Sequence, residues 1–251
     1  AGLFYAIPVF YFLLRKKIPL KEFGIYFAMG MLFIGQAFMG WYMVASGLVE
    51  RPAVDHFRLT IHLLFALSLL ALALWTAYGH KHGFPDYAQK AKWSVISKLA
   101  VVSLVILLIQ ISYGGLVAGL KAGHVSNTWP TMMGQWIPKG IFGANGFDWN
   151  NLIAVPQTVV YIHRWFAFVG LIAVPYVYFA AKKRNYPPEI LRGLVWLIVA
   201  VTTQITLGVL VVWLNVNIAA ASIHQAGAVM LFWLAIFFIH RLRALDHARI
   251  A

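Results

Sequence analysis

Long apolar runs separated by short polar stretches recur along the whole chain. Most of these runs exceed the roughly 18 apolar residues that suffice for a membrane-spanning helix. The predicted segments are Ala1–Leu14, Phe23–Gly47, Phe57–Tyr78, Ile96–Leu120, Gln157–Ala181, Leu191–Leu214 and Ile218–Ile239. The pattern therefore predicts an all-α integral membrane protein with seven spans, of which the first is short.

Composition supports this fold class, since 62% of the residues are hydrophobic and only 11% are charged. Soluble domains carry about 25% charged residues. The net charge of +13 could suggest a nucleic-acid partner, but the basic residues are dispersed at the ends of the segments. Such a distribution is typical of membrane topology signals, so no nucleic acid is expected. The chain has no cysteine, which excludes disulfides and thiolate ligands.

The basic residues also predict the orientation. Fifteen of the twenty lysines and arginines lie after the first, third and fifth segments or in the C-terminal tail. The opposite side has only Arg51, Arg58, Lys121, Lys139 and Arg164. Because cytoplasmic loops are the basic ones, the side with fifteen basic residues is assigned as the inner side and the opposite one as the outer side. The chain is predicted to lie in a bacterial cytoplasmic membrane or a mitochondrial inner membrane.

An internal repeat relates the two parts of the chain. Gly2–Pro19 and Gly170–Pro187 match without a gap at a shift of 168 residues, both apolar and both closed by a basic triplet. The same shift places Gln36–Gly40 on Gln204–Gly208, each with the pattern Gln-x-x-x-Gly. A third Gln-x-x-x-Gly occurs at 110–114. Two homologous halves in one orientation are the simplest account.

The repeat predicts two half-bundles, ideally of four helices each. The first covers residues 1–92 and is incomplete, and the second covers 93–251 and includes an outer loop at 121–156. With a loop six residues shorter, His62 of the first half falls on His224 of the second. An eighth span is expected before Ala1.

Three histidines lie inside spans, and these are the candidates for chemistry. They are His62, His163 and His224, and the predicted topology places all three near the outer face. An ionisable side chain inside a membrane is costly and commonly functional, although a hydrogen bond between helices is the competing explanation. His80, His82, His240 and His247 are expected at the solvated inner side, His56 at the interface, and His124 in the outer loop.

The type of metal follows from the surrounding residues. His163 and His224 open parallel spans that contain no carboxylate or thiol, which suits the two axial positions of a haem. Zinc would need a tighter set of four ligands. Small residues around both histidines would leave room for the macrocycle, although close helix packing explains them equally. They include Ala167, Gly170, Ala219, Ala220, Ala221, Ala226 and Gly227.

Two arginines accompany these histidines. Arg164 adjoins His163, and Arg58 lies four residues before His62, on the same helical face. Each could pair with a haem propionate, or could simply extend to the membrane interface. Trp165 could form a wall of the haem pocket.

The connection from Lys121 to Pro156 is long for a simple connector. Loops of this length are usually functional, so a lid over an outer cavity is expected. Its tryptophans could alternatively form an interfacial belt.

The combined motifs resemble those of the haem A synthase family. The outer loop carries Gly114–Gly123, Asn127–Pro130 and Trp136–Pro138 in the family's order. The remaining matches are Gly40–Leu48, Phe57–Leu59 with His62, the pair His163-Arg164, and Ser222–Gln225. The resemblance extends over essentially the whole chain.

The resemblance implies an eight-helix enzyme that oxidises a methyl group of haem O to the formyl group of haem A, by successive hydroxylation, for cytochrome c oxidase biogenesis. By position, His163 and His224 would ligate a haem b in the second half, with Arg164 and Trp165 beside it. His62 and Arg58 would hold the substrate haem O in the first half. Haem O synthase and cytochrome c oxidase assembly factors are the partners that the resemblance suggests, whereas the electron donor is left open.

The chain departs from the family pattern in two ways. The family's first helix and a Glu-x-x-His-Arg motif are not found, and the glutamate of that motif is the expected catalytic carboxylate. The 168-residue shift places the counterpart of His163 shortly before Ala1, so a His-Arg pair is expected there. The cysteine pair of some bacterial members is also missing.

Two other function classes compete with this reading. A di-haem b-type membrane electron carrier needs the same ligands, so the spans alone do not separate it from the enzyme. A retinal-binding seven-helix receptor would need a lysine in its last span, and Ile218–Ile239 contains none.

Overall fold

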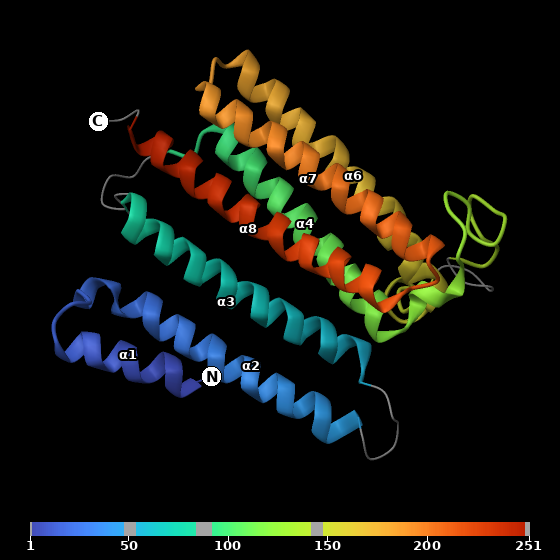
Figure 1. Cartoon of the computed structure of the whole chain (residues 1–251), viewed down its shortest axis with the longest axis horizontal. Coiled ribbons are helices and arrows are strands. Elements are labelled where there is room, and N and C mark those ends of the chain that lie inside the picture. The colour runs from blue at the N-terminus through green and yellow to red at the C-terminus, as the bar shows by residue number, and fades with distance from the viewer. Residues whose placement is uncertain (1, 48–53, 84–91, 142–147, 249–251) are drawn as a thin grey trace. The chain divides into compact units, whose positions relative to one another are not determined.

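The computed structural model describes residues 2–47, 54–83, 92–141 and 148–248. Apart from two short 3₁₀ turns, its regular elements are α-helices (Figure 1). These are α1 (Gly2–Leu14), α2 (Phe23–Gly47), α3 (His56–His82), α4 (Val95–Gly119), α5 (Asn151–Ala154), α6 (Pro156–Lys183), α7 (Pro188–Trp213) and α8 (Ile218–Ala248). Six described helices are long and apolar enough to cross a membrane, and α1 is shorter. The all-α integral membrane fold is thus confirmed.

Local sequence signals begin the three helices that carry the candidate histidines. The carboxylate of Asp55 accepts hydrogen bonds from the backbone of Phe57 and Arg58 at the start of α3. The Asn217 side chain accepts from Ala219 in the same way at the start of α8. Pro156 opens α6, where its missing N–H costs nothing. Because the start of a helix sets the depth and phase of its later residues, these caps position the histidines.

The chain divides into two compact units, Ala1–Phe84 and Pro85–Ala251. In the first unit, α2 packs against both α1 and α3. Its candidate histidine, His62, is the seventh residue of α3.

In the second unit, α4, α6, α7 and α8 form a four-helix bundle. Both α6 and α8 pack against α4 and against α7, so α6 and α8 occupy opposite corners. His163 is the eighth residue of α6 and His224 the seventh residue of α8. The two histidines therefore enter the bundle from opposite corners at similar depth.

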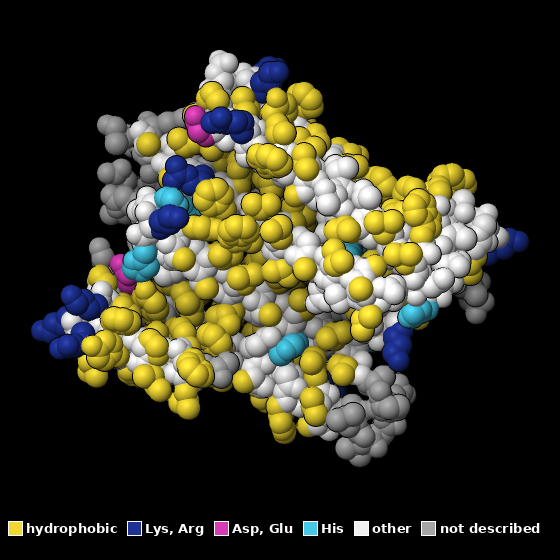
Figure 2. All heavy atoms as spheres, in the orientation of Figure 1, with side chains coloured by type: hydrophobic (Ala, Val, Ile, Leu, Met, Phe, Trp, Pro, Cys, Tyr) yellow, Lys and Arg dark blue, Asp and Glu magenta, His cyan; other side chains and the backbone are white. Residues whose placement is uncertain are grey.

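Hydrophobic side chains dominate the exposed faces of the helices, as expected for a lipid-facing surface. Figure 2 shows these side chains along the helices, whereas lysines and arginines gather near helix ends. Examples of large exposed apolar residues are Phe4, Trp41, Ile172 and Trp196. Outside a membrane, such faces would be unfavourable in water.

The inner end of α8 differs from the sequence prediction. The last span was expected to end at Ile239 with His240 in solvent, but α8 continues to Ala248 and His240 is fully buried. The extension is possible because Arg243 and Asp246 neutralise each other, with Nη1 and Oδ2 3.0 Å apart. Ser97 Oγ donates a hydrogen bond of 2.6 Å to the same Asp246 oxygen and attaches α8 to α4.

A smaller correction concerns the inner end of α3. The loop was expected to begin at Gly79, but the helix continues to His82. His80 is exposed, as expected, and its Nε2 lies 2.9 Å from the hydroxyl of Tyr26. The side chain of His247 lies outside the described residues.

Candidate functional site

The structure brings His163 and His224 together inside the second bundle. Their ring centroids are 6.5 Å apart and the ring planes are nearly perpendicular, at 89°. Two imidazoles on opposite sides of one metal ion, each with a metal–nitrogen bond of about 2 Å, have ring centres about 6 Å apart. The spacing between the two side chains therefore suits a shared metal centre.

A glutamine from a neighbouring helix holds each of these rings. Nε2 of Gln110 on α4 lies 3.2 Å from Nδ1 of His163 and donates to the His163 carbonyl oxygen at 2.9 Å. Nε2 of Gln204 on α7 makes the same two contacts with His224, at 3.1 and 2.8 Å. In both cases Nδ1 accepts from the amide nitrogen, and no hydrogen bond to Nε2 is found within the described ranges. Nε2 of each ring is therefore the nitrogen available to a ligand, once its proton has moved to Nδ1.

A glycine four residues after each glutamine makes room for the ring. A Cβ atom at Gly114 would lie 3.3 Å from Cε1 of His163, and one at Gly208 would lie 3.0 Å from Cε1 of His224. Residues four apart lie on one face of a helix, so the glutamine and the glycine address the same histidine. Gly227 clears space for Gln204, whose Oε1 would collide with an added Cβ atom.

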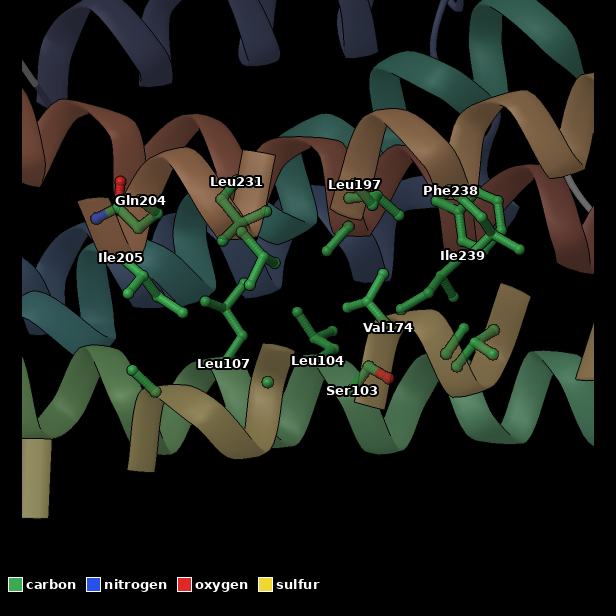
Figure 3. Close-up of a pocket in the computed structure, with 17 residues that line it drawn as sticks. Ser103, Leu104, Leu107, Val174, Leu197, Gln204, Ile205, Leu231, Phe238 and Ile239 are labelled. Atoms are coloured by element: carbon green, nitrogen blue, oxygen red, sulfur yellow. The ribbon is translucent and has the colours of Figure 1, made fainter. Parts of the chain in front are cut away.

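An apolar cavity extends from this layer toward the inner side of the bundle. Figure 3 shows Gln204 at one end of the labelled residues and Phe238 and Ile239 at the other, with Leu104 and Leu107 of α4 pointing inward between them. Ala167 and Gly170, two of the small residues noted in the sequence, line the same cavity.

These residues fit a haem. Two imidazole rings lie 6.5 Å apart in a bundle that also holds an apolar cavity, and a bis-histidine haem needs both features. The buried Oε1 of Gln110 has no hydrogen-bond partner, and a ring proton on Nδ1 of a metal-bound His163 would supply one after a half turn of the amide group. In the described part of the chain, no group of three or more potential metal ligands assembles.

Arg164 anchors the outer loop. Its Nη1 donates to the carbonyl oxygen of Thr128 at 2.9 Å and its Nη2 to that of Ser126 at 2.6 Å. Ser126 Oγ in turn accepts from the backbone of Met133 at 3.2 Å. The sequence left two environments open for Arg164, a haem propionate or the membrane interface; in the structure both terminal nitrogens bind the loop. The helix that carries His163 thus fixes the adjacent loop by a bidentate contact.

Trp165 strengthens the same connection. Its ring centre lies 6.0 Å from that of Trp136 in the outer loop, and 6.3 and 5.7 Å from those of Tyr161 and Phe168 on α6. Nearby, Ala122, Met132 and Val160 form a small buried cluster that joins the loop to α6. His124 of the loop is exposed. The described part of the loop is thus packed on the outer end of α6.

The first unit holds its histidine in a related way. Nε2 of Gln36 lies 3.1 Å from Nε2 of His62, and a Cβ atom at Gly40 would lie 3.3 Å from His62 Cε1. Arg58 lies one turn earlier on α3, with its guanidinium 4.1 Å from the centre of the Tyr42 ring. The structure therefore places Arg58 and His62 on one face of α3, toward α2.

The glutamines are the site residues that the sequence reasoning did not assign. The Gln-x-x-x-Gly pattern was recognised only as a mark of the repeat. Its signal as a site was available, because each pattern lies within a span at the depth of a histidine in the next long helix.

Known proteins match this chain over nearly its whole length. The model of the COX15-CtaA family, described as cytochrome oxidase assembly protein, matches residues 1–236. A protein named heme A synthase from Flavobacterium johnsoniae is 36% identical over 245 residues, which cover 96% of this chain and 70% of the relative. Proteins of the same name from Wolbachia pipientis and Nitrosomonas eutropha are 38% and 34% identical, again over 96% of this chain and over 67% and 68% of their own lengths. No solved structure matches significantly. The chain therefore belongs to the COX15-CtaA family of cytochrome oxidase assembly proteins.

Proposed function

We propose that this chain is an oxidoreductase of haem A biosynthesis. The reaction is the oxidation of a methyl group of haem O to the formyl group of haem A, by successive hydroxylation, in support of cytochrome c oxidase assembly. Membership of the family and relatives named heme A synthase support the assignment. The observation that carries it to a site is the pair His163 and His224, whose rings lie 6.5 Å apart in the second bundle.

In this proposal the two units have different roles. His163 and His224 hold a resident haem b, which supplies one-electron transfer when bound. His62 supplies an axial position for the substrate haem in the first unit, and Arg58 lies one turn away on the same helix. Arg164 and Trp165 keep the outer loop packed on the helix that carries His163.

The location follows from the same topology. The chain is an integral membrane protein, and with its basic loops on the inner side all three histidines lie near the outer face of the membrane. The membrane is the bacterial cytoplasmic or mitochondrial inner membrane. Among the residues that line the apolar cavity, only Gln204 and Ser103 have polar side chains, so this part of the bundle offers an apolar environment to a macrocycle.

Spectroscopy and haem extraction test the proposal. The purified protein should show a six-coordinate low-spin haem, and His163→Ala and His224→Ala should each abolish or convert that signal. Extraction should yield haem b together with haem O, a hydroxylated intermediate or haem A. Haem b alone would instead favour a membrane electron carrier. An unchanged low-spin spectrum in both histidine variants would refute the site.

A further inference from the structure

The same three-residue arrangement occurs three times in the described helices. In each, a glutamine and the glycine one turn after it face a histidine of the neighbouring long helix. The sets are Gln36, Gly40 and His62; Gln110, Gly114 and His163; and Gln204, Gly208 and His224. Recurrence of one geometry around each candidate ligand indicates a role that concerns the ligand itself.

In the second unit, each glutamine holds both the ring and the backbone of one histidine. The amide nitrogen of Gln110 reaches Nδ1 and the carbonyl oxygen of His163, and Gln204 treats His224 likewise. A single side chain thereby fixes the rotation of the ring and its position on the helix. Bonds between helices alone would not require the ring nitrogen.

A histidine that binds a metal through Nε2 carries its proton on Nδ1, and this proton needs an acceptor. The acceptor at hand is the amide oxygen of the same glutamine. A half turn of the amide group brings it to the ring and gives up the hydrogen bond from the amide nitrogen to the histidine carbonyl oxygen. For Gln110 this oxygen is buried and has no partner in the described structure. The side chain that contacts His163 thus carries an unused acceptor.

We propose that Gln110 and Gln204 are positioning residues for the proposed haem site. Each accepts the Nδ1 proton of its histidine, selects the tautomer that leaves Nε2 free, and raises the electron density of the ligand. A stronger acceptor makes the imidazole a stronger donor, which stabilises ferric over ferrous haem. The glutamines therefore contribute to the reduction potential of the haem. This inference rests on the proposed function.

The first unit contains the same components with the ring turned. Gln36 contacts Nε2 of His62, while Nδ1 of His62 and Oε1 of Gln36 are both buried and without a partner. Half a turn of the imidazole would bring Nδ1 to Gln36, as in the other two sets. Gln36 therefore has the corresponding role for His62.

The test uses the full chain purified with its haem. Gln204→Leu removes the acceptor and should raise the reduction potential. Gln204→Glu has the same shape but is a stronger acceptor, so it should lower the potential. We expect at least a tenfold change in the ferrous-to-ferric ratio at a fixed ambient potential, which is about 59 mV for a one-electron couple. The corresponding Gln110 variants should behave alike.

Gln225→Leu is the matched control, because Gln225 adjoins His224 but is exposed on α8. It should leave the potential unchanged. If the glutamines were purely structural, the reduction potential would not shift, or it would shift in the same direction in the Leu and the Glu variants. Either result overturns the inference. If the leucine variant does not retain haem, the glutamate variant decides, since an unchanged or raised potential overturns it. If the histidine variants lose the low-spin signal but the glutamine variants keep the wild-type reduction potential, this inference is refuted while the proposed haem site stands.

Discussion

Under the proposed function, replacing Gly208 by alanine should loosen the hold of the second unit on its haem. The added Cβ atom would lie 3.0 Å from Cε1 and 3.6 Å from Nε2 of His224, whereas ordinary contacts of a Cβ atom begin near 3.4 Å. The imidazole must therefore move by several tenths of an ångström. Gln204 holds the ring and the backbone of the same histidine, so the ring has little freedom to yield.

The expected magnitude follows from the cost of overpacking. Inserting a methyl group into a filled site costs about 1–3 kcal/mol. In the bound form the iron would hold the ring in addition to Gln204, so most of this cost falls on the bound form. At about 1.4 kcal/mol per factor of ten, haem affinity should fall by roughly 5- to 150-fold. Alanine also favours the helix by about 0.5–1 kcal/mol over glycine, but this gain is shared by both forms and cancels in the affinity.

The assay compares the rate of haem loss to an excess of a haem-scavenging apoprotein, followed by the low-spin absorbance. Gly114→Ala should show a smaller effect, since its Cβ atom would lie 3.3 Å from His163 Cε1. Gly193→Ala, at the inner end of the same helix as Gly208, is the control because its Cβ atom would lie 3.4 Å from the Phe238 ring. Wild-type retention in Gly208→Ala, or equal loss in Gly193→Ala, would refute the steric reasoning.

Two further substitutions test other parts of the second unit. Arg164→Lys keeps the charge but lacks the two-pronged guanidinium that binds two carbonyl oxygens at once. Trypsin should therefore cleave the outer loop after Lys121 or Lys139 faster than in wild type. Equal cleavage rates would show that Arg164 does not anchor the loop. Asp246→Ala removes the carboxylate partner of the buried Arg243 and should cost about 3–5 kcal/mol of stability, measured by thermal unfolding in detergent. Glu189→Ala breaks an exposed pair with Arg192 and should change almost nothing; similar losses in both variants would contradict the buried-pair argument.

Hydrophobic patterning was sufficient to predict the helices because each span must be apolar along its whole length. The predicted segment Phe23–Gly47 coincides with α2, and the other long segments differ from their helices mainly at the inner ends. The largest of these differences, at the inner end of α8, has a clear cause. Charged residues such as Arg243 and Asp246 mark the end of a span by hydropathy, yet a pair three residues apart on a helix satisfies itself and allows the helix to continue.

The candidate site was predictable only in part. A histidine inside an apolar span is a strong signal, so His62, His163 and His224 could be selected without a structure. Gln110 and Gln204 gave a weaker signal, because a glutamine in a span is also a common contact between helices. The partner of Arg164 was not predictable, since backbone carbonyl groups of a loop leave no trace in the sequence.

The contacts indicate that the repeating element is a pair of neighbouring helices. In α4 with α6, α7 with α8, and α2 with α3, the first helix supplies the glutamine and the glycine, and the second supplies the histidine. Two such pairs close the bundle of the second unit, which is why its two histidines meet across the centre. Under the proposed function, the sets in both units would hold and orient a haem in the same way, because they use the same residue types. The difference between carrying an electron and being oxidised would then arise from residues outside these sets.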